Sequence, residues 1–432
     1  MKRKIKQIIP IIAFIGMCGS AFSQESGGKK MNLSLKEAQD YAVQNNKNVM
    51  NAGLSVSEAQ KRTWEVISAG LPQVSASVDY TNMMGFKMSF AGMNIALEPT
   101  SNFQATVSQL LFNGSYWVGI KMSRIGEELT ETVRMQAELD VKHQTQTAYN
   151  AILVASENLE ILQQNLKNIE TLAKSAEDLV RIGVAEQTDA DQIKVQVLTM
   201  TNAIKMVERN VELAYNLLRF QLGVETDTEI TLTQTLEDLM AANDANEILL
   251  MEFDPDANYT VQLLNGQIDI ANMQLSLERA ACLPTVVAFY NYTHKIKKST
   301  FDMSPNNVIG LQASIPIFAS GQRHVRAQQA KINIEKTQND RALLTEGLLM
   351  QEKQLRFNLN SAIESFELQK EAKDVSQRVF ESITRKFQQG TASSLDVTTA
   401  NTSLLQAQGN YINAMMEVFS AQTELEKLLN NF

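Results

Sequence analysis

The chain has 432 residues, a formal net charge of −9 and two cysteines. An acidic chain without a basic cluster argues against nucleic acid as a partner, and so few cysteines exclude a disulfide-rich fold. No segment beyond the N-terminal 23 residues reaches about 18 consecutive apolar residues, so no transmembrane helix is expected.

Residues 1–23 have the pattern of a secretory signal peptide. Four basic residues up to Lys6 precede an apolar run over residues 8–17, and the small residues Ala21 and Ser23 precede a cleavage point. The apolar run is too short to span a bilayer. We therefore expect an exported protein, with a retained membrane anchor as the alternative.

Export changes both the charge and the cysteine count. Removal of residues 1–23, with their four positive charges, takes the formal net charge from −9 to −13. Cys282 is then the only cysteine, so no intramolecular disulfide is possible. Lipid modification of Cys18 is a separate possibility, which the preceding Met17 disfavours because a small residue normally stands there.

The mature chain contains the same pattern twice. Apolar residues recur at steps of three and four over residues 190–218 and again over residues 397–425, at a constant offset of 207. The Ala-Gly-Leu-Pro segment at 69–72 likewise matches Ala-Cys-Leu-Pro at 281–284, at an offset of 212. This agreement in order predicts two structural repeats, each with a helix, a strand pair, a long helix, a turn and a helix.

The first repeat is expected over residues 24–223. Ser34 and Glu37 have capping-box spacing and predict a helix from about 34 to 70, where a following proline prevents continuation. Heptad spacing of apolar residues predicts a coiled-coil helix from about 119 to 182, which would be ~96 Å long. The helices at 34–70 and 190–222 together reach ~105 Å, so stacked end to end they could cover the long helix.

Each repeat also contains an expected strand pair, at about 73–112 and about 285–318. Apolar and polar residues alternate in these segments, and each run is close to the 9–11 residues that a tilted strand needs to cross a bilayer. The expected apolar face holds Phe103 and Leu311, and the expected polar face holds Gln104 and Gln312.

Four strands are too few for a closed transmembrane sheet. An unpaired edge in lipid costs several kcal/mol for each free backbone group, and about eight strands are needed for even a filled barrel. Several chains would therefore share one β-barrel, with the polar faces toward a wet lumen and the apolar faces toward lipid.

Between the repeats, residues 224–258 form an acidic connector. The wider segment 220–278 contains twelve Asp and Glu residues and no Lys or Arg. We interpret the connector as a solvated surface insert, with a charge-reading site as the alternative. The second repeat, residues 259–432, follows it.

These features resemble the TolC-like outer-membrane efflux family. The resemblance is carried by the order of the elements and by three motifs: Leu-Ser-Leu-Lys-Glu-Ala at 33–38, Phe-Gln-Gln-Gly-Thr at 387–391, and Leu-Asp-Val at 395–397. It covers essentially the whole mature chain. It implies a mainly α protein with transmembrane β structure, in which a homotrimer forms a twelve-strand barrel continued by a periplasmic α-helical tunnel.

The resemblance also implies a function. The chain would be the exit duct of a tripartite efflux system in the outer membrane, which passes small molecules to the outside from a periplasmic adaptor (a membrane fusion protein) and an inner-membrane transporter. An exit duct for type I protein secretion and a coiled-coil envelope protein without a pore are the alternatives. We expect no enzymatic activity, no cofactor and no nucleic-acid partner; the transported substrate, the adaptor and the pump stay open.

The candidate site residues lie at the two helix-turn-helix tips, at about 181–189 and about 386–396. The resemblance implies that these tips form the periplasmic entrance, where Asp189, Asp396 and Phe387 would act in gating. The tip turns and the adaptor contact would involve Gly183, Val184, Gly390 and Thr391.

The second tip departs from the family pattern. Some members have tyrosine and arginine where this chain has Phe387 and Ala392, and the contacts of those two residues help to close the resting channel. The same contacts cannot form here. A structural alternative applies to Asp189 and Asp396. Each carboxylate would stabilise the positive end of the helix that begins there by about 0.3–1 kcal/mol.

Histidine and tryptophan add two further expectations. The three histidines, His143, His294 and His324, have no second ligand at helical spacing, so no metal site is expected. Trp64 and Trp117 flank the first strand pair. They could lie near a membrane edge, where indoles are favoured, or pack between helices.

Overall fold

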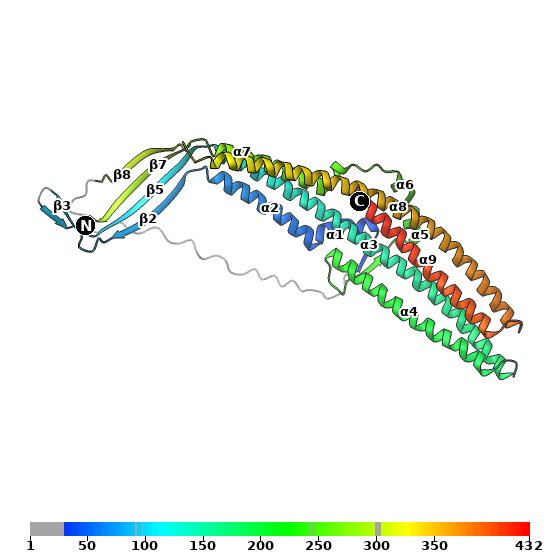
Figure 1. Cartoon of the computed structure of the whole chain (residues 1–432). Coiled ribbons are helices and arrows are strands. Elements are labelled where there is room, and N and C mark those ends of the chain that lie inside the picture. Colours follow the sequence, from blue (N-terminus) through cyan, green and yellow to red (C-terminus); the bar gives the residue numbers. More distant parts are fainter. Residues whose placement is uncertain (1–29, 91–92, 97, 243–244, 299–303) are drawn as a thin grey trace, which may run out of the picture.

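A computed structural model describes residues 30–90, 93–96, 98–242, 245–298 and 304–432. The molecule is elongated, with a curved antiparallel sheet at one end and a long layer of helices over the rest of its length (Figure 1). The expected signal peptide, its cleavage point and Cys18 lie outside the described residues.

Most of the chain lies in helices. The first half contains β1 (Lys30–Leu33), α1 (Leu35–Asn45), α2 (Lys47–Ser68), β2 (Gln73–Thr81), β3 (Lys87–Phe90), β4 (Met93–Ala96), β5 (Thr100–Asn113), α3 (Gly114–Arg181) and α4 (Gln187–Leu222). The second half contains β6 (Glu229–Leu232), α5 (Leu236–Ala242), α6 (Ala245–Leu250), a 3₁₀ turn (Pro255–Ala257), α7 (Tyr259–Ala280), β7 (Thr285–Lys297), β8 (Asn307–Ser314), α8 (Gln322–Gln388) and α9 (Ser394–Leu428).

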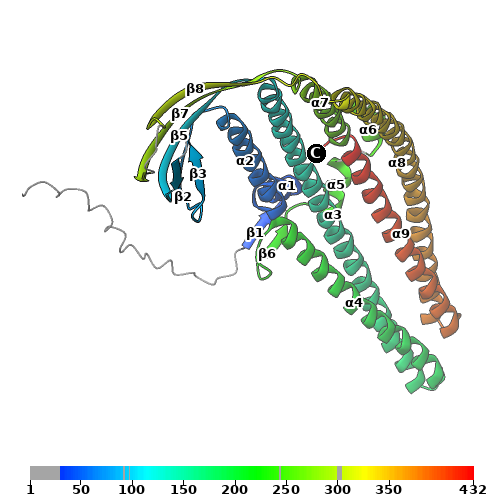
Figure 2. The same ribbon diagram turned by 60° about the vertical axis from the view of Figure 1, so that its left-hand side comes forward.

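The helices form one layer built around two long members. With 68 and 67 residues, α3 and α8 are each ~100 Å long at the α-helical rise. On one side of α3 lie α2 and α4 in succession, and between α3 and α8 lie α7 and α9 in succession (Figures 1 and 2). The short helices thus cover the long ones end to end. None of the helices in the described parts of the chain is long and apolar enough to cross a membrane.

The expected single helix over 34–70 is wrong in one respect, because the chain breaks it at Asn46. The capping box is present: Glu37 accepts from the Ser34 amide at 2.8 Å, and Ser34 caps the helix start. Asn46, however, is extended (φ −64°, ψ 131°) and its side chain caps the first turn of α2. The side-chain Nδ2 of Asn46 also donates to the Gln221 carbonyl at 2.8 Å, which ties the break to the end of α4.

The sheet has the strand order β2-β5-β7-β8, with every pair antiparallel. Its register sorts the alternating side chains onto two faces. Phe103 lies opposite Val78, while Gln104 lies between Ser77 and Thr293. The face that includes Phe103 also carries Val74, Ala76, Tyr80, Ala105, Val107, Tyr290, Tyr292 and Ile309.

The strand boundaries differ from expectation at two places. The last strand ends at Ser314 rather than near residue 318, since Pro316 cannot donate a ladder hydrogen bond. In the first strand pair, a separate hairpin of β3 and β4 lies between β2 and β5 in the sequence, while β2 and β5 pair directly with each other in the sheet. The sheet itself therefore has four strands, with β2 and β8 at its edges.

The acidic connector is not simply a solvated insert. Its strand β6 pairs in parallel with β1, and four of its apolar side chains are buried, namely Ile230, Leu236, Leu239 and Ile248. Arginines of α8 hold the rest in place: Arg356 donates to carbonyls of Leu249 and Met251, and Arg341 pairs with Asp256 at 2.6 Å. The acidic composition gives no sign of this packing, because the described carboxylates are exposed and only four apolar side chains are buried.

Gly223 provides a test of the break between α1 and α2. It ends α4 at φ +67°, and a Cβ there would lie 2.7 Å from the Asn45 carbonyl oxygen. Gly183 has a similar φ of +77° with nothing within 4 Å, so Gly183→Ala is the matched control. We expect Gly183→Ala to cost about 1 kcal/mol of unfolding free energy and Gly223→Ala about 1–3 kcal/mol more, measured by denaturant unfolding in detergent. Equal losses in the two variants would contradict the tight approach at Asn45.

Candidate functional site at the helical tips

The first tip joins α3 to α4 through a glycine turn. Gly183 takes a left-handed conformation, and the Val184 amide donates to the Leu179 carbonyl at 2.9 Å, which closes the end of α3. Val184 and Ile182 are both about two-thirds exposed at this end of the molecule. The turn thus presents apolar side chains to its surroundings at the point farthest from the sheet (Figure 1).

The second tip joins α8 to α9 in the same way. Gly390 has φ +73°, and both the amide and the hydroxyl of Thr391 donate to the Lys386 carbonyl, at 2.9 and 3.1 Å. Leu395 is 64% exposed, matching the apolar exposure of the first tip. The two tips therefore have the same construction, as their matching positions in the sequence suggest.

Asp396 forms a capping box at the start of α9. Its carboxylate accepts from the Ser393 amide at 2.9 Å and from the Ser393 hydroxyl at 2.8 Å, while the Asp396 amide donates to Ser393 Oγ. The Ser393 amide and then the Ser393 hydroxyl lower the pKa of Asp396, so its side chain is charged at neutral pH. A helix-start role is thus present at Asp396, and the side chain is also solvent-exposed and charged.

Asp189 has a capping role and a second partner. One carboxylate oxygen accepts from the Glu186 amide at 3.2 Å, at the start of α4. The other accepts a hydrogen bond from the hydroxyl of Ser394, which is almost completely buried at the start of α9. Ser394 also lies 3.2 Å from Gln192 Oε1. Asp189 therefore ties the first tip to the second within one chain.

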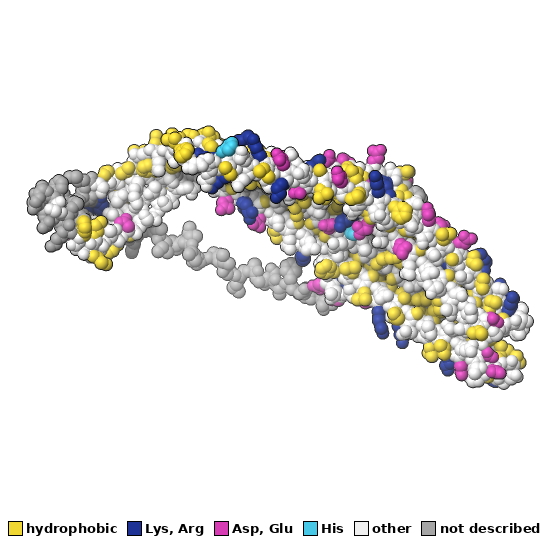
Figure 3. Space-filling model, viewed as in Figure 1, with side chains coloured by type: hydrophobic (Ala, Val, Ile, Leu, Met, Phe, Trp, Pro, Cys, Tyr) yellow, Lys and Arg dark blue, Asp and Glu magenta, His cyan; other side chains and the backbone are white. Residues whose placement is uncertain are grey.

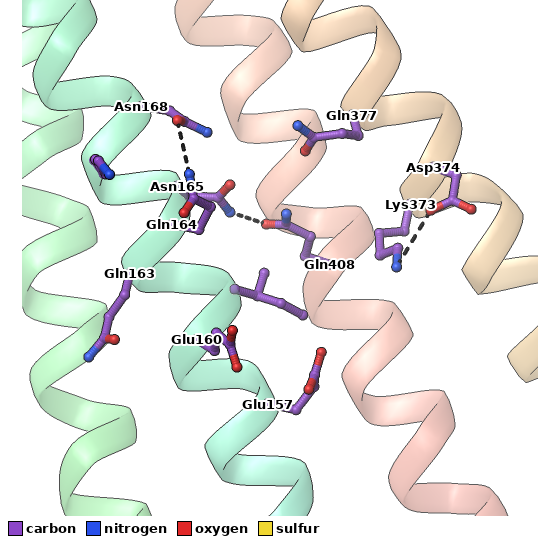
Figure 4. Close-up of a pocket in the computed structure, with 12 residues that line it drawn as sticks. Glu157, Glu160, Gln163, Gln164, Asn165, Asn168, Lys373, Asp374, Gln377 and Gln408 are labelled. Atoms are coloured by element: carbon purple, nitrogen blue, oxygen red, sulfur yellow. Dashed lines mark hydrogen bonds and ion pairs between the residues drawn. The ribbon is translucent and has the colours of Figure 1, made fainter. Parts of the chain in front are cut away.

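Ser394 belongs to a set of buried polar residues that sequence reasoning missed. In α9, Ser394, Asn401 and Gln408 recur every seven residues and are at most 6% exposed. Asn401 donates to Gln196 of α4 at 3.3 Å, and Asn165 of α3 donates to Gln408 at 2.5 Å (Figure 4). The sequence signal for these residues is a polar residue at a constant heptad position, in a helix whose apolar residues repeat more prominently. We call this set the polar seam.

Phe387 lies in the core rather than on the surface of the tip. It is 5% exposed and packs in an apolar cluster with Phe380, Leu172, Ile193 and Val397. Ala392 packs against the same cluster, so small and apolar residues fill this region. Phe387 thus joins α8 to the other three helices of the tip, and any part it has in gating stays a prediction.

Beside the polar seam, α3, α8 and α9 enclose a polar groove of about 610 Å³. Glu157 and Glu160 of α3 and Lys373 and Asp374 of α8 line it, together with amide side chains (Figure 4). Burial raises the pKa of Glu157, with Glu160 adding to the shift. No group of three or more His, Cys, Asp and Glu within the described parts of the chain could hold a metal ion.

Comparison with known proteins identifies the family. The chain is 23% identical to the outer membrane protein TolC of Salmonella enteritidis, over 95% of this chain and 83% of that protein. Its fold resembles the crystal structures of CusC (TM-score 0.75, 16% identity, 92% of each chain) and of VceC from Vibrio cholerae (TM-score 0.73, 16% identity, 91% of this chain and 95% of that one).

The match to one protein family covers most of the chain, including both tips. The outer membrane efflux protein family matches residues 39–224 and 258–431, which include both helix pairs and all four strands of the sheet. The chain therefore belongs to the outer membrane efflux protein family, and it is an outer-membrane exit duct with a large periplasmic portion.

Proposed function

We propose that the chain performs its exit-duct function as a ring of three copies, in which the sheets join into one twelve-strand barrel and the helices into one periplasmic tube. One observation carries this proposal: the open edges of the sheet and the open edges of the helical layer lie on the same two sides of the molecule. One edge of the molecule is formed by β2, α2 and α4, and the opposite edge by β8 and α8 (Figure 2). We call them the α4 edge and the α8 edge.

The sheet supports this proposal because both of its edge strands are free to pair. Since successive strands alternate in direction, β8 runs antiparallel to β2. A β8 strand could therefore pair with β2 of the next copy and continue the same antiparallel pattern. Repetition of a head-to-tail contact of this kind generates a closed ring when the rotation closes.

The helices support the same contact. On α8, exposed apolar residues recur at steps of seven and eleven, which places them in one stripe: Val325, Ile332, Leu343, Met350, Phe357, Leu368 and Val375. On α4, a second exposed apolar set includes Val195, Leu198, Met206, Leu213, Leu217 and Phe220. Two apolar stripes on opposite edges are complementary surfaces for neighbouring copies.

We further propose that the tips meet a periplasmic adaptor, which links the duct to an inner-membrane transporter. The paired glycine turns, with exposed Val184 at the first and Thr391 at the second, offer two similar surfaces per chain. The cargo would be small molecules. Protein secretion by the same duct is the second candidate, and no residue described above favours it. No enzymatic activity is expected for the duct itself.

The ring predicts a three-copy particle in the outer membrane. Met350→Glu combined with Phe357→Glu should prevent its formation, because charges would enter the apolar contact between copies. Gln351→Glu combined with Asn358→Glu adds the same charge one residue away from the stripe and should leave the particle intact. Mass measurement by light scattering in detergent, after membrane fractionation, checks both outcomes. A single-chain, soluble wild-type protein would refute the proposal.

The sheet faces predict opposite accessibility for neighbouring residues. In a background of Cys282→Ser, cysteines at Phe103 and Leu311 should be shielded by lipid. Cysteines at Gln104 and Gln312 should react with a water-soluble maleimide through the lumen. Labelling in reconstituted vesicles measures this, and reversed reactivity would place the apolar face toward the lumen, since successive residues of a strand point to opposite faces.

The tip carboxylates predict ion selectivity. With three copies around one axis, Asp396 and Asp189 would each form a ring, and carboxylate rings concentrate cations. Asp396→Asn keeps the cap geometry but removes the charge, so single-channel recordings should show weaker cation selectivity with the three-copy particle intact. Asp189→Asn should have a smaller effect on selectivity, because Asp189 is engaged with Ser394. Glu346→Gln, far from the tips on α8, is the control. Unchanged selectivity in both tip variants would leave Asp396 only its helix-start role, and Asp189 only its helix-start role and its link to Ser394.

A further inference from the structure

The junction between the sheet and the helices carries a band of exposed apolar side chains. Between β8 and α8, Ile317 and Phe318 are 92% and 86% exposed, and Leu111 at the end of β5 is 55% exposed. Both tryptophans of the chain, Trp64 and Trp117, lie at the same level and are each 60% exposed. A hydrogen bond from Tyr116 to the Ile67 carbonyl, 2.8 Å long, fixes that common level by joining α3 to α2.

Immediately beyond this band, the charge of the chain reverses. Over the whole sequence, 48 acidic residues outnumber 39 basic ones. The helical turns next to the sheet contain eight Lys and Arg residues but only three Glu residues. These turns are residues 58–70, 114–126, 272–282 and 320–332. Lys and Arg side chains gather on the convex side just past the sheet, next to the hydrophobic side chains (Figure 3).

Six of these cations are exposed and have no ion-pair partner in the described parts of the chain: Lys61, Lys121, Arg124, Arg279, Arg326 and Lys331. Farther along the helices the cations are mixed: some, such as Arg378, are also exposed without an ion-pair partner among the described residues, and others are paired. Arg134 pairs with Glu131 and Glu138, and Arg341 pairs with Asp256. We call the six residues the basic collar.

We propose that the basic collar binds the phosphate groups of anionic phospholipids in the periplasm-facing leaflet of the outer membrane, and so fixes the depth of the duct in the bilayer. This inference rests on the proposed function, because it needs the sheet to lie in the membrane. The chemistry required of the ligand is a row of anionic phosphates directly beside an apolar phase, and a bilayer surface provides that arrangement.

Residue spacing links the collar to the band. On α3, Trp117, Lys121 and Arg124 follow at steps of four and three, so they share one face, and all three are exposed. Since α2 and α7 flank α3, that face is one of the two open surfaces of the helical layer. On α2, Lys61 precedes Trp64 by three residues, which gives the same pairing of an indole and a cation. Indoles are favoured at the headgroup level, and an adjacent cation would reach the phosphates.

The two tryptophans make the proposal directly measurable. The protein would be reconstituted in vesicles of equal parts phosphatidylglycerol and phosphatidylcholine, with bromine on the acyl chains of one lipid at a time. Bromine quenches nearby tryptophan, so the fluorescence of Trp64 and Trp117 reports which lipid surrounds the collar. We expect brominated phosphatidylglycerol to quench at least about twofold more than brominated phosphatidylcholine, because several Lys and Arg side chains act together.

A collar variant tests the cause. The combination Lys121→Gln, Arg124→Gln, Arg326→Gln and Lys331→Gln should make the two brominated lipids quench equally. The control combination Lys174→Gln, Lys353→Gln, Lys370→Gln and Arg378→Gln removes the same charge from exposed positions farther along α3 and α8, and should keep the preference. Inorganic phosphate at millimolar concentration should not remove the preference of the wild type.

The outcomes separate this inference from the proposed function. If the wild type fails to enter the vesicles on flotation, the proposed function is wrong. If it enters but neither brominated lipid quenches, or if both quench the wild type equally, the basic collar does not bind lipid phosphate. The same conclusion follows if the collar variant keeps the preference, or if inorganic phosphate abolishes it, since the site would then prefer the free ion.

Discussion

Pairing of backbone hydrogen bonds at the sheet edges is the constraint on which the rest of this structure depends. In lipid there is no water to pair with a free N–H or carbonyl group, so every strand needs two neighbours. The described part of the chain supplies four strands to this sheet and leaves β2 and β8 each with one neighbour. Because β2 follows α2 and β8 precedes α8, the same two ends of the sheet continue into the two edges of the helical layer. The need of β2 and β8 for a second neighbour therefore determines how both the sheet and the helical layer are arranged.

The helical layer meets this constraint by duplication. A single helix as long as α3 cannot be buried within a small globule, and two shorter helices in succession cover it instead. The offsets of 212 and 207 residues between equivalent helices show how closely the two halves correspond: α2 and α7 begin and end 212 residues apart, and α4 and α9 begin 207 apart. The polar seam then joins the two halves where apolar packing alone would allow them to slide, since a shifted register would leave buried amides unpaired.

Sequence patterns predicted the features that are local or periodic. The long helices, the alternation of the strands and the capping box at Ser34 follow from residue spacing, whereas the family follows from the resemblance carried by the order of the elements and three short motifs. The break at Asn46 could not be predicted, because its partner Gln221 is 175 residues away in sequence and close only in the fold. The same reason applies to Ser394, which hydrogen-bonds to Asp189, 205 residues earlier. The interpretation of the connector as a solvated insert was wrong, because its composition is acidic while its packing depends on four buried apolar residues.

The pairing of β1 with β6 has a consequence for how the chain matures. Lys30 is the register partner of Glu229, so the first strand to leave the inner membrane finds its partner only after about half of the polypeptide has followed. Until then the backbone groups of β1 have no strand partner. The break after α1 is also unsupported, because Asn46 hydrogen-bonds to Gln221 near the end of α4, which has not yet been exported. Folding of this exported chain is therefore delayed by its own topology. A partner that holds the N-terminal segment during transit would shorten the time for which that edge is exposed to other unfolded chains.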